Sequence, residues 1–324
     1  MRDNQGMHTV ISYAAPTGPQ CRQAMDALQL PHLTRLLREL SPTATQAGQA
    51  DQLTPLHERV QARHLGLGDA PDGLLPWAAQ DAQRLGLTAE HGGEGWAWIT
   101  PCQWQVHTHH VNMTDPQQLA LTPEEAQALH AAMQPYFAED GITLFPHALG
   151  HAHTRWLARG DVFQALPTAS LDRVAGQPVD AWIPRQAQAS ALRRLQNEMQ
   201  MLLYTHAVND ARAARGQPAV NSFWASGTGA WAATDPTASP STVLHALRDA
   251  ALEDDASAWA QAWQELDRTT LAELLARAQA GEPVQLTLCG EQQAQTLEWQ
   301  APSLWTRLRQ RLTAPPATTW LKTL

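Results

Sequence analysis

The sequence predicts an α/β fold in which a mixed sheet is layered with helices. Short apolar runs alternate along most of the chain with segments whose apolar residues recur at helical spacing, as in layered α/β proteins. Apolar residues make up 44% of the chain, which is enough for a sizeable buried core. A helical bundle or a β-sandwich would lack this alternation, so we exclude both.

The length of 324 residues suits one large domain or two modest ones. We expect a single large α/β domain over residues 1–324. Within it we consider a subdivision into an N-terminal part, 1–140, and a C-terminal binding part, 141–324. No internal repeat and no long low-complexity segment marks a boundary in the sequence.

The first predicted element is a buried strand over His8–Ala15, an apolar run that ends before Pro16. Apolar residues then recur at helical spacing over Cys21–Leu40. Pro31 divides this segment into two helices, because proline begins a helix more readily than it continues one. The polar stretch Ser41–Gln52 predicts a surface loop.

Two short helices and a pair of strands follow. The helices are predicted over Pro55–Leu65 and Leu75–Leu85, on either side of the turn region Gly66–Gly73. Over Gly95–Val111, large apolar residues alternate with smaller or polar ones apart from a slip at Pro101. This period predicts a strand pair or one bent strand.

A helix is predicted over Thr122–Met133. It starts with Thr-Pro-Glu-Glu, which places a proline in the first turn and acids near the positive end of the helix dipole. Short strands are expected at Gly141–Pro146 and Thr154–Leu157. Asp161–Pro184 has little periodicity, and Gln186–His206 carries the longest helical pattern.

The last third begins with a buried strand over Val220–Trp224, which is predicted to end in a turn of small residues, Ser226–Gly229. Backbone N–H groups in such a turn can hold an anion. The segment matches neither the P-loop nor the dinucleotide-binding motif, so a plain turn is the commoner explanation. The remaining predicted elements are helices at Leu252–Leu266, Leu271–Ala280 and Leu304–Leu312, and a hairpin of strands Val284–Cys289 and Gln295–Trp299.

Composition excludes several classes of protein. The net charge of −9 provides no basic field for nucleic acid or an anionic membrane. The three cysteines, Cys21, Cys102 and Cys289, are far apart, which argues against a disulfide scaffold and a thiolate zinc site. Neither a signal peptide nor a spanning apolar segment is present. We therefore expect a cytoplasmic bacterial protein without a nucleic-acid or membrane partner.

Polar side chains are concentrated in Met199–Gly229, and we predict the binding site there. Its first half is expected to end an amphipathic helix and its second half to form the buried strand and glycine turn. Arginine suits bidentate capture of carboxylate or phosphate. The chain's central arginines could converge on a small anion or pair with surface acids: Arg155, Arg159, Arg173, Arg212 and Arg215.

Two groups of histidines are weak candidates for a metal site. Imidazole is a common zinc, copper or iron ligand, and alternate residues of a strand share one face. Neither group matches a sharp metal motif, and polar histidines without a metal are the alternative. We assign no metal and no cofactor from sequence. The candidates are His107, His109 and His110, and His147, His151 and His153. No nucleophile elbow is present, so Ser12, Ser170, Ser222 and Ser226 are nucleophile candidates only by residue type.

Tyr204–Gly229 resembles a segment of the archaeal-type, cofactor-independent phosphoglycerate mutases. There a helix carrying His-Pro-x-Asn and Arg precedes Pro-Ala-Asn and Trp-Gly-x-Gly. Arg155–Asp180 resembles the preceding arginine strand and turn of that family. Leu30–Leu37 resembles a helix of the wider alkaline phosphatase superfamily.

Most of the chain is more similar to a proteobacterial group described as RpfE-type regulatory or phosphoglycerate mutase-like proteins. The similar segments are LLPWAA, TPCQWQV, PTASLDR, LRRLQNEMQMLLYTH, VNDARAARG, VNSFW and LTLCGE. The mutases bind two metals, beginning with an Asp after the first strand. Ile11–Ala15 holds no acid here, and after Trp224 the chain has one histidine, His245, and no Asp-His pair. Two-metal phosphoryl transfer needs such ligands.

The resemblance therefore implies a regulatory protein without mutase turnover that binds a small anionic ligand, phosphorylated or carboxylate, or a protein partner. The residues we expect to bind the ligand are Arg155, Asp172, His206, Asn209, Arg212 and Asn221. The arginines would hold the anion, His206 and the asparagines would position it, and Asp172 would orient an arginine. One alternative is an active metal-dependent mutase or phosphotransferase that uses the histidine clusters. Another is a buried hydrogen-bonded network that joins a helix to a strand.

Overall fold

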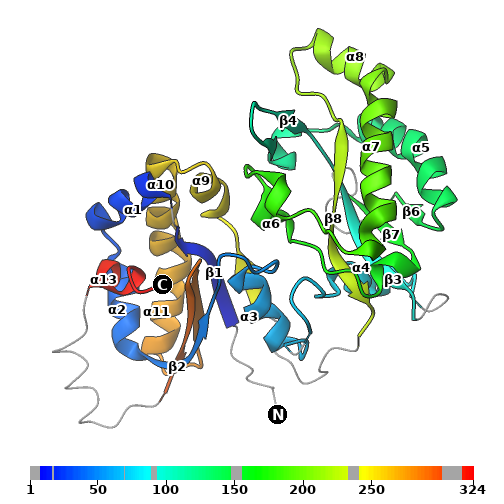
Figure 1. The fold of residues 1–324 in the computed structure, drawn as a ribbon. Helices are drawn as coiled ribbons and strands as arrows, with labels where there is room; N and C mark the ends of the chain where they lie inside the picture. Colours follow the sequence, from blue (N-terminus) through cyan, green and yellow to red (C-terminus); the bar gives the residue numbers. More distant parts are fainter. Residues whose placement is uncertain are drawn as a thin grey trace. The chain divides into compact units, whose positions relative to one another are not determined.

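The computed structural model describes residues 8–16, 18–68, 70–88, 93–146, 155–232, 241–300 and 316–324. The chain forms two compact units (Figure 1). The first comprises Met1–Asp51, Pro55–Asp69 and Thr234–Leu324, and the second comprises Gln52–Thr54 and Ala70–Ala233. The second unit is thus an insertion in the first. The subdivision considered from sequence, between residues 140 and 141, falls inside the second unit.

The first unit is built on a mixed sheet, whose described strands lie in the order β2-β11-β10-β1-β9. The strands are β1 (His8–Ala15), β2 (Leu40–Ala47), β9 (Ser241–Leu244), β10 (Gln285–Gly290) and β11 (Gln293–Trp299). β1 runs parallel to β9 and β10, whereas β11 runs antiparallel to β10 and β2. This mixed sheet with its helices confirms the predicted fold class.

Helices pack on both faces of this sheet. One face carries α1 (Pro19–Ala24), α2 (Pro31–Glu39), α9 (Arg248–Leu252), α10 (Ala256–Leu266), α11 (Ala272–Gln279) and α13 (Ala317–Leu321). The other face carries α3 (Leu56–His64). Successive strand side chains point to opposite faces, so Ile11 packs in the larger core while Val10 contacts the core beneath α3.

The prediction of a surface loop over Ser41–Gln52 was wrong, because this segment contains β2. It pairs with β11 from Leu40 opposite Trp299 to Ala47 opposite Gln293. β2 lies at the edge of the sheet and most of its side chains are exposed, so it lacks the apolar alternation by which a strand is recognised. The predicted helix Leu304–Leu312 lies outside the described residues.

The second unit contains an antiparallel sheet whose described strands lie in the order β6-β7-β3-β8. The strands are β3 (Gly95–Cys102), β6 (Thr143–Phe145), β7 (Trp156–Arg159) and β8 (Ser222–Ala230). Beside them, β4 (Trp104–Val106) and β5 (Val111–Met113) form a separate hairpin.

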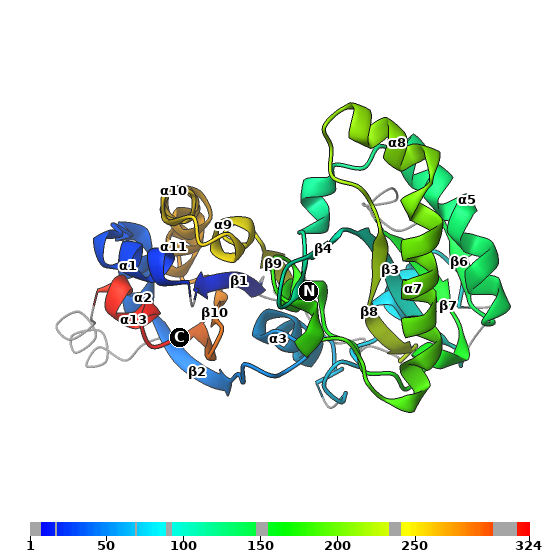
Figure 2. The same cartoon turned by 45° about the horizontal axis from the view of Figure 1, so that its top comes forward.

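α5 (Pro123–Glu139) and α7 (Ser190–Tyr204) pack on one face of the antiparallel sheet, and α4 (Trp77–Arg84) packs against the other. Figure 2 shows α7 lying along β8. No helix within the described ranges is long and apolar enough to cross a bilayer.

The glycine run after Trp224 is a bulge within β8 and not the predicted turn. Trp96 of β3 faces Gly229 and Trp98 faces Ser226, so β8 holds one extra residue between these pairs. Gly227 has a φ of 62°, and a Cβ there would lie 2.8 Å from the Trp98 ring. Glycine is required at this position both by the backbone angle and by the close approach of the indole.

We expect Gly227→Ala to lower the free energy of unfolding by more than Gly216→Ala. Both substitutions place alanine at a positive φ, at a cost of about 1–2 kcal/mol. Space around Gly216 is open, whereas Gly227 adds a clash with Trp98 worth about 1–3 kcal/mol. Urea denaturation measures both losses, and equal losses would contradict a packing role for the bulge.

Candidate functional site

The residues predicted from sequence to bind a ligand all lie in the second unit. His206, Asn209 and Arg212 belong to α8 (Ala207–Ala214) or its N-cap, and Asn221 lies just before β8. Arg155 precedes β7, and Asp172 is in α6 (Leu171–Val174). Their contacts show what each side chain does in the fold.

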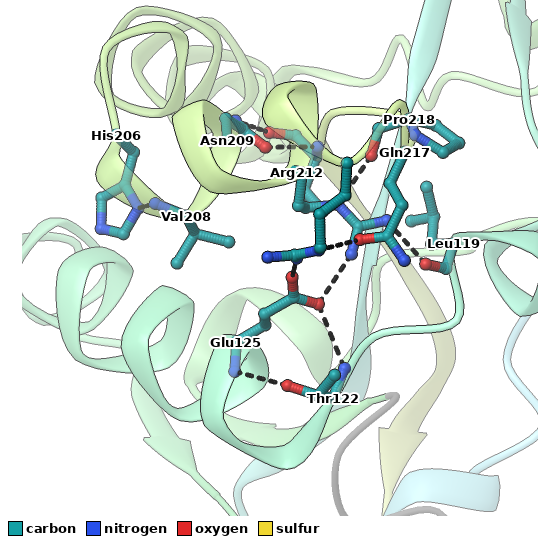
Figure 3. A network of polar contacts seen from close by, with 11 residues as sticks. Leu119, Thr122, Glu125, His206, Val208, Asn209, Arg212, Gln217 and Pro218 are labelled. Atoms are coloured by element: carbon teal, nitrogen blue, oxygen red, sulfur yellow. Dashed lines mark hydrogen bonds and ion pairs between the residues drawn. The ribbon is translucent and has the colours of Figure 1, made fainter.

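Arg212 is fully buried, and each of its guanidinium nitrogens has a protein partner (Figure 3). Nε donates to the Pro218 carbonyl at 2.7 Å, and Nη2 donates to the Leu119 carbonyl at 2.6 Å. Nη1 donates to Glu125 Oε2 at 2.7 Å. Arg212 therefore joins α8 to α5, to the segment before α5 through Leu119 and to the segment after α8 through Pro218.

Glu125 is the shared acceptor of this network. Its Oε1 accepts from the half-exposed Arg215, and its Oε2 accepts from the Thr122 N–H at 3.1 Å. Thr122 Oγ1 in turn accepts from the Glu125 N–H at 3.2 Å, which completes the capping box that the sequence predicted for α5. One carboxylate thus caps a helix and neutralises a buried cation.

The two asparagines replace missing backbone partners. Asn209 Nδ2 donates to the carbonyls of Leu203 and Val220, each at 2.7 Å, and its Oδ1 accepts from the Val220 N–H at 2.9 Å. Asn221 Oδ1 accepts from the Trp104 N–H at 2.7 Å, and its Nδ2 donates to the Trp104 carbonyl at 2.9 Å. Each amide holds a chain segment as a neighbouring strand would.

His206 explains why the polar stretch does not continue the preceding helix. Its Nδ1 accepts from the Val208 N–H at 3.2 Å, so the imidazole caps a new helix, α8. The expectation that the first half of Met199–Gly229 would end one amphipathic helix was therefore wrong, because a second helix begins within it. α7 ends at Tyr204, and α8 begins three residues later at Ala207.

Arg155 contacts elements other than those around Arg212. Its guanidinium carbon lies 3.9 Å from the centroid of the Trp98 ring, and Nη2 lies 3.6 Å from Asp81 Oδ2. Asp172 donates its backbone N–H to Ser170 Oγ at 3.3 Å, at the start of α6. The two arginines thus pair with different carboxylates, and a joint role in holding one ligand stays a prediction.

The histidine candidates divide between described and undescribed parts of the chain. His107 and His110 stack at 4.9 Å between ring centroids, in the loop joining β4 and β5, and His109 is exposed. His147, His151 and His153 lie outside the described residues.

Asn209 and Asn221 border a pocket of about 570 Å³ in the second unit. Val106 and Tyr204, which are 83% and 84% exposed, also line it. The charged side chains in its lining are Asp180 and Asp210. Two carboxylates beside apolar surface do not favour a small anion, but they suit an apolar or cationic partner.

A different set of polar groups converges in the first unit, where β9 ends and its pairing with β1 stops. Open α/β sheets bind ligands at the carboxyl ends of their parallel strands. Ile11 pairs with Leu244, so Ser12 and His245 follow at the same edge. Ser12 Oγ donates to the Leu244 carbonyl at 3.0 Å and lies 3.3 Å from His245 Nδ1.

Ser12 Oγ thus contacts both the Leu244 carbonyl and Nδ1 of His245. When Ser12 donates its one proton to the carbonyl, Nδ1–H can donate to Oγ, and Nε2 then has the lone pair that metal binding needs.

His57, in the first turn of α3, completes the group. Its ring centroid lies 5.5 Å from that of His245, and the two residues offer nitrogen atoms within 4.8 Å of each other. Tyr13 lies 5.6 Å from His57 between ring centroids and has a φ of 56°, which is rare for an aromatic residue. Such strained backbone tends to occur at functional sites.

This group was not predicted from sequence. Ser12 was a candidate only by residue type, His245 was an isolated histidine, and His57 carried no motif. The one available signal was fold-based, because residues that follow parallel strands meet at one edge of the sheet. Two imidazoles within 4.8 Å can share a transition-metal ion, so this pair is a candidate metal site.

Comparisons with known proteins find distant structural likenesses. No protein-family model and no curated protein matches the chain. Solved structures similar to it include the cofactor-independent phosphoglycerate mutase from Thermoplasma acidophilum DSM 1728, at 12% identity and a TM-score of 0.35, covering 93% of this chain and 91% of that one. Another is the PH0037 protein from Pyrococcus horikoshii, at 9% identity and a TM-score of 0.43, covering 91% and 87%.

Removal of the buried guanidinium of Arg212 should lower the stability of the second unit. We expect Arg212→Ala to lower the free energy of unfolding by about 3–5 kcal/mol, because it leaves Glu125 buried without its main partner. Arg215→Ala is the matched control on the same carboxylate. Since Arg215 is half exposed, its loss should cost about 1 kcal/mol or less. Denaturant titration followed by tryptophan fluorescence compares them, and similar losses would refute the structural role.

Proposed function

We propose that the protein binds a divalent transition-metal ion between His57 and His245 and, at that ion, a small anionic ligand, phosphorylated or carboxylate. The approach of the two imidazoles, one from the first turn of α3 and one from the residue after β9, is the observation that carries this proposal. The anionic ligand predicted from sequence is thereby reassigned from the arginines of the second unit to the first unit.

The surrounding residues suit this role. The contact of Ser12 with Nδ1 of His245 suits the tautomer with the lone pair on Nε2, and orientation of a ligating imidazole by a second hydrogen bond is a common feature of metal sites. A bound ion would supply positive charge and open coordination positions for an anionic oxygen. Buried His57 provides a fixed ligand, while exposed His245 provides access.

A regulatory binding role fits this site better than mutase turnover. Phosphoryl transfer with two metals needs ions that hold both the attacking and the leaving oxygen, and carboxylates are their usual ligands. β1 ends in Ser-Tyr-Ala-Ala without a carboxylate. The alternative function is a metal-dependent phosphoglycerate mutase or phosphotransferase.

The test is calorimetric titration of the purified, chelator-treated protein with Zn²⁺. We expect one ion per chain, with His57→Ala and His245→Ala each removing that binding, because neither imidazole alone holds the ion. Ser12→Ala should weaken binding by about 10–100-fold through loss of its hold on His245. His109→Ala, an exposed histidine of the second unit, is the control and should bind as wild type does.

A second titration with 3-phosphoglycerate, which the sequence resemblance selects as the first ligand to try, should give binding only to the Zn²⁺-loaded protein. Zn²⁺ binding that survives both His57→Ala and His245→Ala would overturn the site. Conversion of 3-phosphoglycerate into 2-phosphoglycerate would overturn the regulatory role in favour of the enzymatic alternative.

A second candidate function is docking of a protein partner on the 570 Å³ pocket of the second unit. The observation that favours it is the exposure of Tyr204 and Val106 beside Asp180 and Asp210. Exposed aromatic side chains that line a pocket are frequent binding hot spots.

Photocrosslinking in the native cells tests this second function. With p-benzoylphenylalanine in place of Tyr204, we expect one discrete crosslinked species. The same group at Met201, which is 72% exposed on α7 but does not line the pocket, should give none. Equal crosslinking at both positions would indicate random collision and contradict docking at the pocket.

A further inference from the structure

A polar pocket of about 250 Å³ lies in the first unit, beside the last turn of α3. α3 packs over β1, β10 and β11, and β2 lies beyond β11 at the edge of the sheet. The pocket is bordered by α3, β10, β11 and β2, and its polar lining is Thr43, Gln46, Arg63, His64, Gln285, Thr296 and Glu298. None of these residues belongs to the group formed by Ser12, His57 and His245.

A chain of hydrogen bonds runs from β1 toward the pocket. His8 Nε2 lies 2.8 Å from Thr287 Oγ1, and Thr287 Oγ1 lies 2.8 Å from Thr296 Oγ1. His64, whose ring centroid is 3.8 Å from that of His8, ends this polar layer at the pocket.

Burial favours the neutral form of both imidazoles. Burial and the neighbouring His64 lower the pKa of His8 to about 3. Burial also lowers the pKa of His64, on which Glu298 and Arg63 act in opposite directions. Arg63 and Glu298 therefore supply the charges of the pocket, one of each sign.

The polar groups of the lining are placed to receive a ligand. Gln46 is 8% exposed, and its Oε1 is buried without a hydrogen-bond partner, which is costly unless a donor reaches it. Glu298 is positioned by Gln285, whose Nε2 donates to Oε1 at 2.8 Å. Among the described residues, Arg63 makes no ion pair, with Glu298 or with any other acid.

We propose that this pocket binds a small zwitterion of the amino-acid class. The guanidinium of Arg63 would hold the carboxylate, and Glu298 with Gln46 Oε1 would accept hydrogen bonds from the ammonium group. A guanidinium matches a carboxylate in geometry, and an ammonium group has three donors for such acceptors.

A purely anionic ligand would meet Glu298, and a purely cationic one would meet Arg63, so a ligand bearing both charges fits best. The pocket is smaller than the ~300–1,000 Å³ clefts of drug-sized ligands, which limits the ligand to a small molecule. This site is independent of the metal-binding proposal.

The experiment is titration of the full-length protein, with EDTA present, with the uncharged-side-chain L-amino acids, followed by the ¹H–¹³C NMR signal of the His64 ring and by calorimetry. We expect at least one of them to bind saturably and shift the His64 signal. For the best binder, the N-acetyl derivative, which lacks the ammonium group, and the matching amine, which lacks the carboxylate, should bind at least tenfold more weakly.

Arg63→Gln and Glu298→Gln should each weaken binding at least tenfold, while circular dichroism verifies that both variants are folded. Arg35→Gln removes an exposed arginine from α2, on the opposite face of the sheet, and should leave binding unchanged. The proposal is overturned if no amino acid binds, if either single-charge analogue binds equally well, or if Arg63→Gln has no effect. EDTA keeps each outcome separate from the Zn²⁺ site.

Discussion

The parallel pairing of β1 with β9 is the constraint on which the first unit depends. It joins segments on opposite sides of the inserted second unit, and it brings Ser12 within hydrogen-bonding distance of His245, 233 positions along the chain. Buried backbone groups must be paired, so a β1 that is buried along its full length needs a strand on each side. β10 supplies one neighbour and β9 the other. The candidate metal site is a consequence of this pairing.

In the second unit, buried polar side chains join irregular segments of the chain to the small antiparallel sheet. Arg212 fastens three carbonyl or carboxylate partners, and Asn209 and Asn221 replace strand neighbours for Val220 and Trp104. Such a network is stable only when each member is satisfied, because the low dielectric of the interior makes an unpaired polar group costly. This accounts for the density of Arg, Asn and His in Met199–Gly229.

The same residue types would have suited an anion site, and this explains the ambiguity of that stretch. A guanidinium that could capture a phosphate from solution is held by Glu125 and two carbonyls. Sequence alone cannot distinguish these uses, because the partners Leu119 and Glu125 lie about 90 positions away from Arg212. The buried-network alternative considered from sequence describes these contacts. The proposal of an anionic ligand rests instead on the histidine pair of the first unit.

Local physics was sufficient for much of the fold. The apolar run of β1, the capping box of α5, the proline break before α2 and the β10–β11 hairpin were all predicted from sequence, because each depends on residues a few positions apart. Three features depended on tertiary structure. β2 is identified as a strand by its pairing with β11, the bulge of β8 places Gly227 against the Trp98 ring, and His57 meets His245 from a distant part of the chain. Sequence determined the elements through local propensity, whereas the edge strand, the bulge and the candidate sites were decided by contacts between residues distant in the chain.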